Sequence, residues 1–212
     1  MRVRIILAGL AVACSCANVQ AGGEHERRLA AELAVMAGDA RRLTTGAGGP
    51  LERDGLVKRL NGALSSLPLL LRRANGDPKP VVLMRASLAR HDWRALSATL
   101  AKLKQSHPFD ARSLLVAAPT PEMLTLGASI HQTTCAACHD SATGDSLLPA
   151  KNLAEQLARM SREEFAARLL LGVRGDRTTA LRNPFSDLEL AALIAYYLNP
   201  LARTNQPGGV KQ

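Results

Sequence analysis

The chain is poor in aromatic residues, which make up only 3% of its 212 residues, although hydrophobic residues make up 47%. A core with so few aromatic side chains has to consist mainly of leucine and alanine, which favour helices. We find no convincing strand pattern and therefore expect an all-α protein. The lack of aromatic rings interleaved with basic residues for base stacking also argues against nucleic-acid binding.

Long apolar runs are also missing, since no apolar stretch of 18 residues follows the N-terminus. The N-terminus combines the basic MRVR, the short apolar stretch IILAGLAVACSCA and a small-residue site that ends at Ala21. This pattern predicts a signal peptide at residues 1–21 and export to a periplasm-like compartment. Two alternatives would instead attach the chain to a membrane: retention of the segment, and lipidation of Cys14 in the lipobox-like AVAC.

Cysteine is rare as well, with four residues in the chain. Two of them, Cys14 and Cys16, fall within the predicted signal peptide, which leaves Cys135 and Cys138 and weakens a disulfide-framework interpretation. Cys135 and Cys138 are three positions apart, on one helical turn, and His139 follows directly. This spacing is typical of covalent attachment of one c-type haem, with two thioethers and the histidine as an axial ligand of the iron.

Other interpretations of this CAACH motif have less support. A thioredoxin-like dithiol needs a preceding strand and a βαβ context, neither of which the sequence offers. A zinc site needs two further ligands at close spacing, and the remaining histidines show no such pairing. Those histidines are His25, His91, His107 and His131. A chance occurrence of the motif is the third alternative.

Residues 22–113 contain four amphipathic patterns that are separated by turn sequences such as TTGAGGP and NGDPKP. Apolar residues recur at intervals of three and four, which predicts four helices with short connections in an up-down bundle. Asp92 is expected to cap the fourth helix. The stripes are Leu29, Leu33, Met36, Ala40 and Leu43; Val57, Leu60, Leu64, Leu67 and Leu71; Val81, Met84 and Leu88; and Trp93, Leu96, Leu100 and Leu103. No catalytic motif lies among them.

Helix signals continue in residues 119–202 and end before a short tail at 203–212. Thr120 followed by proline predicts an N-cap and first helical position. Two S-x-x-E sequences, at residues 161–164 and 186–189, predict capping boxes for two further helices.

The second segment resembles the class I mono-haem cytochrome c domain. GASIHQTTCAACH is similar to the first helix of that family, LLPAKNLA to its proline loop, and FSDLELAALIAYYL to its C-terminal helix. The resemblance implies one haem c and a close crossing of the two helices at Gly127, filled by a tyrosine of the last helix. It also implies that the carbonyl of Pro149 accepts the proton of His139 and fixes its tautomer.

The loop that usually supplies a methionine as the sixth iron ligand departs from the family. It spans residues 173–187 here and contains no Met, so either the distal face is open or holds water, or another side chain of this chain reaches it, or a partner subunit supplies the ligand. The candidate ligands are Met160, His107, His91 and Asn183. Without a thioether ligand we expect a lower reduction potential than that of a typical carrier of the family. Arg174 and Arg177 of the same loop are candidates for contacts with the haem propionates.

His131 stands where the family usually has an aromatic residue between the crossing helices. It shares a helix with Cys135, so we expect it on the proximal side, stacked on Tyr196 or Tyr197.

Charge is uneven along the chain, whose net charge is +9. Sixteen Lys and Arg face nine Asp and Glu in residues 22–118, whereas nine of each kind follow from residue 119 onward. The first segment therefore has a basic surface, which would steer an acidic redox partner or contact anionic lipid.

Together these patterns predict an exported c-type cytochrome that transfers single electrons as a carrier or redox subunit, more in keeping with a non-catalytic protein than with an enzyme. The alternative is a haem-based small-ligand binder or enzyme with an open distal site. A third hypothesis is a structural bundle protein whose haem domain has lost rapid electron transfer. The role of residues 22–113 is left open.

Overall fold

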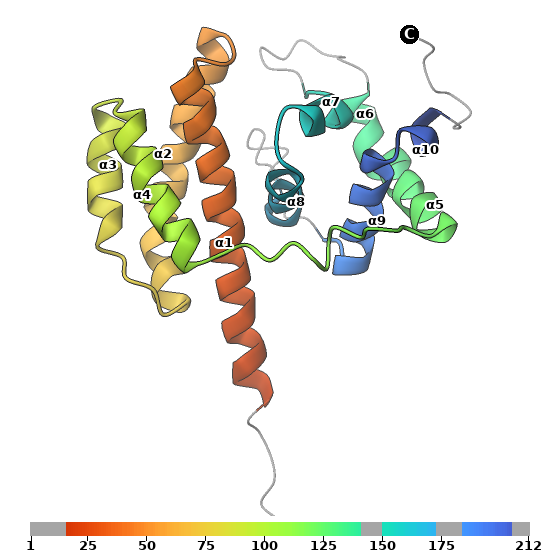
Figure 1. The fold of residues 1–212 in the computed structure, drawn as a ribbon, viewed down its shortest axis with the longest axis horizontal. Coiled ribbons are helices and arrows are strands. Elements are labelled where there is room, and N and C mark those ends of the chain that lie inside the picture. The colour runs from red at the N-terminus through yellow and green to blue at the C-terminus, as the bar shows by residue number, and fades with distance from the viewer. Residues whose placement is uncertain (1–15, 141–149, 173–183, 205–212) are drawn as a thin grey trace, which may run out of the picture.

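The structure is a computed structural model that describes residues 16–140, 150–172 and 184–204, and every regular element in these ranges is a helix. The all-α prediction is therefore confirmed for the described residues. Helices α1 to α4 form one group and helices α5 to α10 a second group beside it (Figure 1). None of the described helices is both long and apolar enough to span a membrane.

The first group is a four-helix bundle. Each helix contacts the next along the chain, and α4 returns to contact α1. Pro50 supplies the first residue of α2, and the Asp92 carboxylate caps α4 by accepting a hydrogen bond from the Ala95 N–H at 3.0 Å. The bounds are Cys16–Thr45 for α1, Pro50–Arg73 for α2, Pro80–Ala89 for α3 and Trp93–Ser106 for α4. The four predicted helices are thus confirmed.

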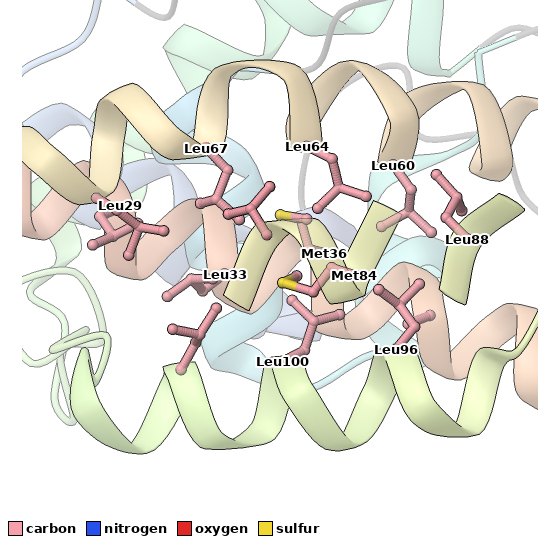
Figure 2. Close-up of a cluster of buried hydrophobic side chains, with 14 of the residues drawn as sticks. Leu29, Leu33, Met36, Leu60, Leu64, Leu67, Met84, Leu88, Leu96 and Leu100 are labelled. Atoms are coloured by element: carbon pink, nitrogen blue, oxygen red, sulfur yellow. The ribbon is translucent and has the colours of Figure 1, made fainter. Parts of the chain in front are cut away.

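The bundle core consists almost entirely of leucine and methionine. Leu29 and Leu67 lie at one end of this core, and Leu60 and Leu96 lie at the other (Figure 2). Fully burying each such side chain contributes about 1.5–3 kcal/mol to the free energy of folding. All the predicted stripe positions are buried except Val57 and Trp93, which are partly buried; Leu56 is the buried neighbour on α2.

The second group has its own core. The helices of this group are α5 (Pro121–Ile130), α6 (Ala136–His139), α7 (Leu153–Ala158), α8 (Arg162–Leu171), α9 (Asp187–Leu198) and α10 (Pro200–Thr204). A π-helical turn at His131–Cys135 lies between α5 and α6. The linker also contributes to this core, because Ala111 and Leu114 are buried in it. The bundle helices therefore end before the predicted boundary at residue 113, and the linker packs with the second group.

Helix caps set the boundaries of the second group. The Thr120 hydroxyl accepts a hydrogen bond from the Met123 N–H at 3.3 Å, as predicted for the start of α5. The capping box of residues 186–189 is complete. The box predicted for residues 161–164 is only half formed: Ser161 accepts from the Glu164 N–H at 3.1 Å, but the Glu164 carboxylate turns to arginines instead. Those arginines attract the carboxylate more strongly than a backbone N–H does.

The two groups meet where α1 packs against α8, and we call this contact the α1–α8 interface (Figure 1). Small side chains of α1, including Ala31 and Ala34, pack against Ala167 of α8 and let the helices approach closely. Two buried carboxylates, Asp39 of α1 and Glu164 of α8, lie in the same interface. They are paired with Arg41, Arg42, Arg59 and Arg168.

Candidate functional site: the CAACH turn

The CAACH turn begins in the π-helical turn at His131–Cys135 and continues into α6. The sequence predicted an unbroken helix here, so the π-helical turn is a finding of the structure. Such turns are rare and frequently occur at functional sites. Cys135 is half-buried against the second core, whereas Cys138 is exposed.

His139 is oriented by one hydrogen bond. Its Nδ1 lies 2.7 Å from the carbonyl oxygen of Lys151. A carbonyl only accepts, so a proton has to be on Nδ1, and in the neutral ring Nε2 is then the nitrogen whose lone pair can bind a metal ion. Pro149, for which the sequence predicted this role, lies outside the described residues. Within the described part of the chain, Lys151 provides the acceptor.

Lys151 also connects this site to the bundle. Its Nζ lies 2.7 Å from the Oε1 of Glu52, in the first turn of α2. Both side chains are partly exposed, so this ion pair contributes at most about 1 kcal/mol to stability. Its position matters more than its strength, because the residue that orients His139 also touches the bundle.

His131 is buried between the crossing helices and uses both ring nitrogens. Nδ1 lies 2.7 Å from the Tyr197 hydroxyl, and Nε2 lies 2.9 Å from Oδ2 of Asp140. His131 contacts both tyrosine rings, as predicted, but it is not stacked on either: the ring of Tyr196 is tilted by 32° at 5.3 Å, and that of Tyr197 lies edge-on at 5.4 Å. The Asp140 partner was not predicted, although its position next to His139 places it at the end of the same turn.

Burial disfavours the ionised forms of Cys135 and Tyr197. It raises the pKa of the Cys135 thiol, and it raises the pKa of the Tyr197 hydroxyl. The two groups also share a hydrogen bond with each other. Cys135 is therefore a neutral thiol at neutral pH rather than a reactive thiolate.

Helices α5 and α9 cross at Gly127 with almost no space between them. A β-carbon on Gly127 would lie 2.1 Å from the carbonyl oxygen of Ala192 and 2.8 Å from Cβ of Tyr196. Only glycine fits there, because the obstructing atoms include rigid backbone. The predicted crossing, with a tyrosine beside it, is present. It positions the helix that leads into the CAACH turn.

The other predicted site residues are placed as follows. Met160 packs against the second core with Leu153 and Leu157. His107 lies at the end of α4 against Gly76 of the bundle, where a β-carbon on the glycine would meet its Nε2 at 3.0 Å. His91 is stacked on Trp93. Arg174, Arg177 and Asn183 lie outside the described residues.

In the part of the chain that the structure describes, no three His, Cys, Asp or Glu side chains are grouped as they would be around a metal ion. Comparisons of the chain with protein-family models, with curated proteins and with solved structures found no match.

Proposed function

We propose that the chain is an exported c-type cytochrome that holds one haem at the CAACH turn and transfers single electrons. The observation that carries this proposal is the orientation of His139. Its Nδ1 is engaged by the Lys151 carbonyl at 2.7 Å, so Nε2 is the nitrogen left to coordinate iron. This is the arrangement expected of an axial histidine whose ring is held by a second interaction.

The residues of the turn fit a covalently bound haem. Cys135 and Cys138 would hold it by adding their thiols across its two vinyl groups, a step that needs no oxidant. The Cys135 thiol is protonated and half-buried, which protects it from oxidation before attachment. The chemistry that the group supplies when bound is the reversible one-electron change of its iron.

Other residues give the site its rigidity. Gly127 lets α5 and α9 approach closely, and the buried His131 ties the end of the turn to α9 through Asp140 and Tyr197. A rigid surround lowers the reorganisation that accompanies electron transfer. This supports a carrier or redox subunit, and a protein partner of acidic character is consistent with the basic bundle.

The test is to express the full chain together with a c-type haem attachment system and to measure covalently bound haem by mass and by the pyridine haemochrome spectrum. We expect one haem per chain in the parent, a single thioether or a loss of haem in Cys135→Ala and Cys138→Ala, and a changed ligand spectrum in His139→Ala. The matched control is Cys14→Ala with Cys16→Ala, which should keep full haem. Full covalent haem in Cys135→Ala with Cys138→Ala would disprove the proposal.

The same preparation tests the alternative with an open distal site. Immediate binding of carbon monoxide to the reduced protein would favour a small-ligand binder or enzyme. A six-coordinate haem that does not react with carbon monoxide would favour electron transfer. A methionine-to-iron charge-transfer band would show that a thioether ligand comes from outside residues 173–187.

A further inference from the structure

Helix α3 has two contrasting faces. Val81, Met84 and Leu88 are buried in the bundle core. The opposite side carries Lys79, Val82, Leu83 and Arg90, and we call these four residues the outer α3 face. They follow the i, i+3, i+4 spacing of one helical stripe, with Arg90 two turns further on.

The two aliphatic residues of this face are among the most exposed apolar side chains in the described part of the chain. Val82 is 70% exposed and Leu83 is 66% exposed. They are adjacent in sequence and flanked on both sides by basic residues, Lys79 before them and Arg90 after them. Isolated exposed leucines need no explanation, but an adjacent aliphatic pair between two cations is an amphipathic surface.

The surroundings of the face are strongly basic. Residues 60–109 contain eight Lys and Arg but only two Asp and Glu. Both acids have local structural roles: Asp77 accepts a hydrogen bond from the Lys79 N–H at 2.9 Å, and Asp92 caps α4. Arg85 lies between α3 and α2, where its Nη2 donates to the Leu64 carbonyl at 2.9 Å, and it adds its charge to one edge of the face. Three of these cations, Lys79, Arg85 and Arg90, belong to α3 or to its ends, so the exposed aliphatic pair lies in a basic setting.

The position of α3 in the fold leaves this face uncovered. In Figure 1, α3 lies on the outer side of the bundle, and α1 separates it from the second group of helices. The turn from α2 to α3 points toward the same end of the bundle as the start of α1 at Cys16. The apolar sequence IILAGLAVACSCA, residues 5–17, overlaps that start by two residues.

We propose that the outer α3 face docks the bundle on an anionic phospholipid surface. Lys79 and Arg90, with the neighbouring Arg85, would face the lipid headgroups, and Val82 and Leu83 would enter the boundary between headgroups and acyl chains. Hot spots on protein partners are rich in tryptophan and tyrosine, but this face is aliphatic, and the one nearby aromatic, Trp93, is half-buried and stacked on His91. The chemistry of the face therefore fits lipid better than an acidic protein.

Docking in this way places the CAACH turn on the side of the molecule away from the lipid (Figure 1). The exposed Cys138 and the turn around it would stay accessible to a soluble partner. The docking itself does not depend on haem attachment, so it can be tested whether or not the proposed function holds.

The test is co-sedimentation of the full chain with vesicles of phosphatidylcholine alone and of an equal mixture with phosphatidylglycerol. We expect binding to the anionic vesicles to be at least about tenfold stronger, and to weaken as salt is raised from about 0.05 to 0.5 M. Val82→Ser with Leu83→Ser, and separately Lys79→Glu with Arg90→Glu, should each weaken it roughly tenfold.

Matched controls come from exposed residues elsewhere. Leu51→Ser with Leu188→Ser removes two exposed leucines, and Arg159→Glu with Arg162→Glu reverses two exposed charges of the second group. Both pairs should bind within about twofold of the parent, and circular dichroism melts should show that every variant is folded. Undiminished binding by the α3 variants would assign the binding to the N-terminal segment and overturn the proposal. Capture by an immobilised acidic protein without vesicle binding would overturn it in favour of a protein partner.

Discussion

The Glu164 carboxylate of α8 occupies the space that a side chain at Gly38 of α1 would fill. A β-carbon on Gly38 would lie 2.2 Å from the carboxyl carbon of Glu164. From this position Oε1 accepts from Arg42 at 2.9 Å and from Arg168 at 2.7 Å, and Oε2 accepts from Arg41 at 2.7 Å. Because Gly38 has no side chain, the buried carboxylate of Glu164 can be held by arginines of the bundle and of the second group at once.

Gly38→Ala should destabilise the protein by about 1–3 kcal/mol, because the methyl group displaces a carboxylate that arginines hold in place. The measurement is a double-mutant cycle with Glu164→Ala in urea unfolding. In the Glu164→Ala background the obstructing atoms are gone, so Gly38→Ala should cost much less than in the parent.

The control for this cycle is Gly62→Ala, an exposed helical glycine with no atom within 4 Å of its added β-carbon. It should stabilise the protein by about 0.5–1 kcal/mol, because alanine favours a helix. If Gly38→Ala lowers the free energy of unfolding equally in the parent and in the Glu164→Ala variant, the steric contact between position 38 and the Glu164 carboxylate is contradicted.

The α1–α8 interface should weaken in acid. Burial alone would raise the pKa of Glu164, but the guanidinium groups of Arg168, Arg42 and Arg41 outweigh it and hold the pKa below the ordinary value of 4.5. A lowered pKa means that the ionised form stabilises the fold, so this contribution is present at neutral pH and is lost as pH falls below about 4.5.

Glu164→Gln should therefore be about 3 kcal/mol less stable than the parent at neutral pH, and the difference should shrink in acid. Thermal and urea unfolding from about pH 7 to pH 3 measure this. The control is Glu163→Gln, an exposed neighbour on the same helix, which should leave the pH profile unchanged. If the difference in the free energy of unfolding between Glu164→Gln and the parent stays constant over this pH range, the ionised form of Glu164 is not what stabilises the interface.

Gly127→Ala should destabilise the crossing of α5 and α9 by more than about 1–3 kcal/mol, since the Ala192 backbone cannot move aside as a side chain can. Urea unfolding measures the loss, and Gly62→Ala again serves as the control. Attachment of the proposed haem at the CAACH turn should also fall in yield, because α5 leads directly into the turn. A Gly127→Ala variant as stable as the parent would show that the helices are further apart than the structure places them.

His131→Phe keeps a ring between the tyrosines but leaves the buried Tyr197 hydroxyl without its histidine partner. We expect a loss of about 1–3 kcal/mol in the free energy of unfolding. Adding Tyr197→Phe should restore part of that loss, because the buried hydroxyl that lost its histidine partner is then removed. If the losses of the His131→Phe and Tyr197→Phe single variants simply add in the double variant, the 2.7 Å contact between His131 and Tyr197 contributes no coupling energy.

Much of the fold follows from local pattern. The four apolar stripes of the bundle correctly marked its helices, because a 3.6-residue period shows directly which face of a helix is buried. The caps at Asp92, Thr120 and Ser186 were predicted for a similar reason, since a cap acts on backbone groups two or three residues away. The CAACH spacing likewise predicted two thiols about one helical turn apart, with an imidazole directly after the second.

Glu164 shows where local pattern fails. Its position three residues after Ser161 predicted a capping box, and the cap from Ser161 does form. The carboxylate instead pairs with Arg41, which is 123 residues away, with Arg42 next to it, and with Arg168 of its own helix. Similarly, the partner of His139 is the Lys151 carbonyl, and that of His131 is Asp140 at the far end of the turn.

The sequence by itself therefore determined the helices, their caps and the spacing of the cysteines and histidine, because these depend on contacts within a few residues. Only the tertiary structure decided that α1 packs on α8, that Glu164 is buried among arginines, and that Nδ1 of His139 is held by the Lys151 carbonyl. Periodicity shows that a face is buried but not against which partner. That choice depends on how small residues such as Gly38, Gly127 and Ala167 let particular helices approach.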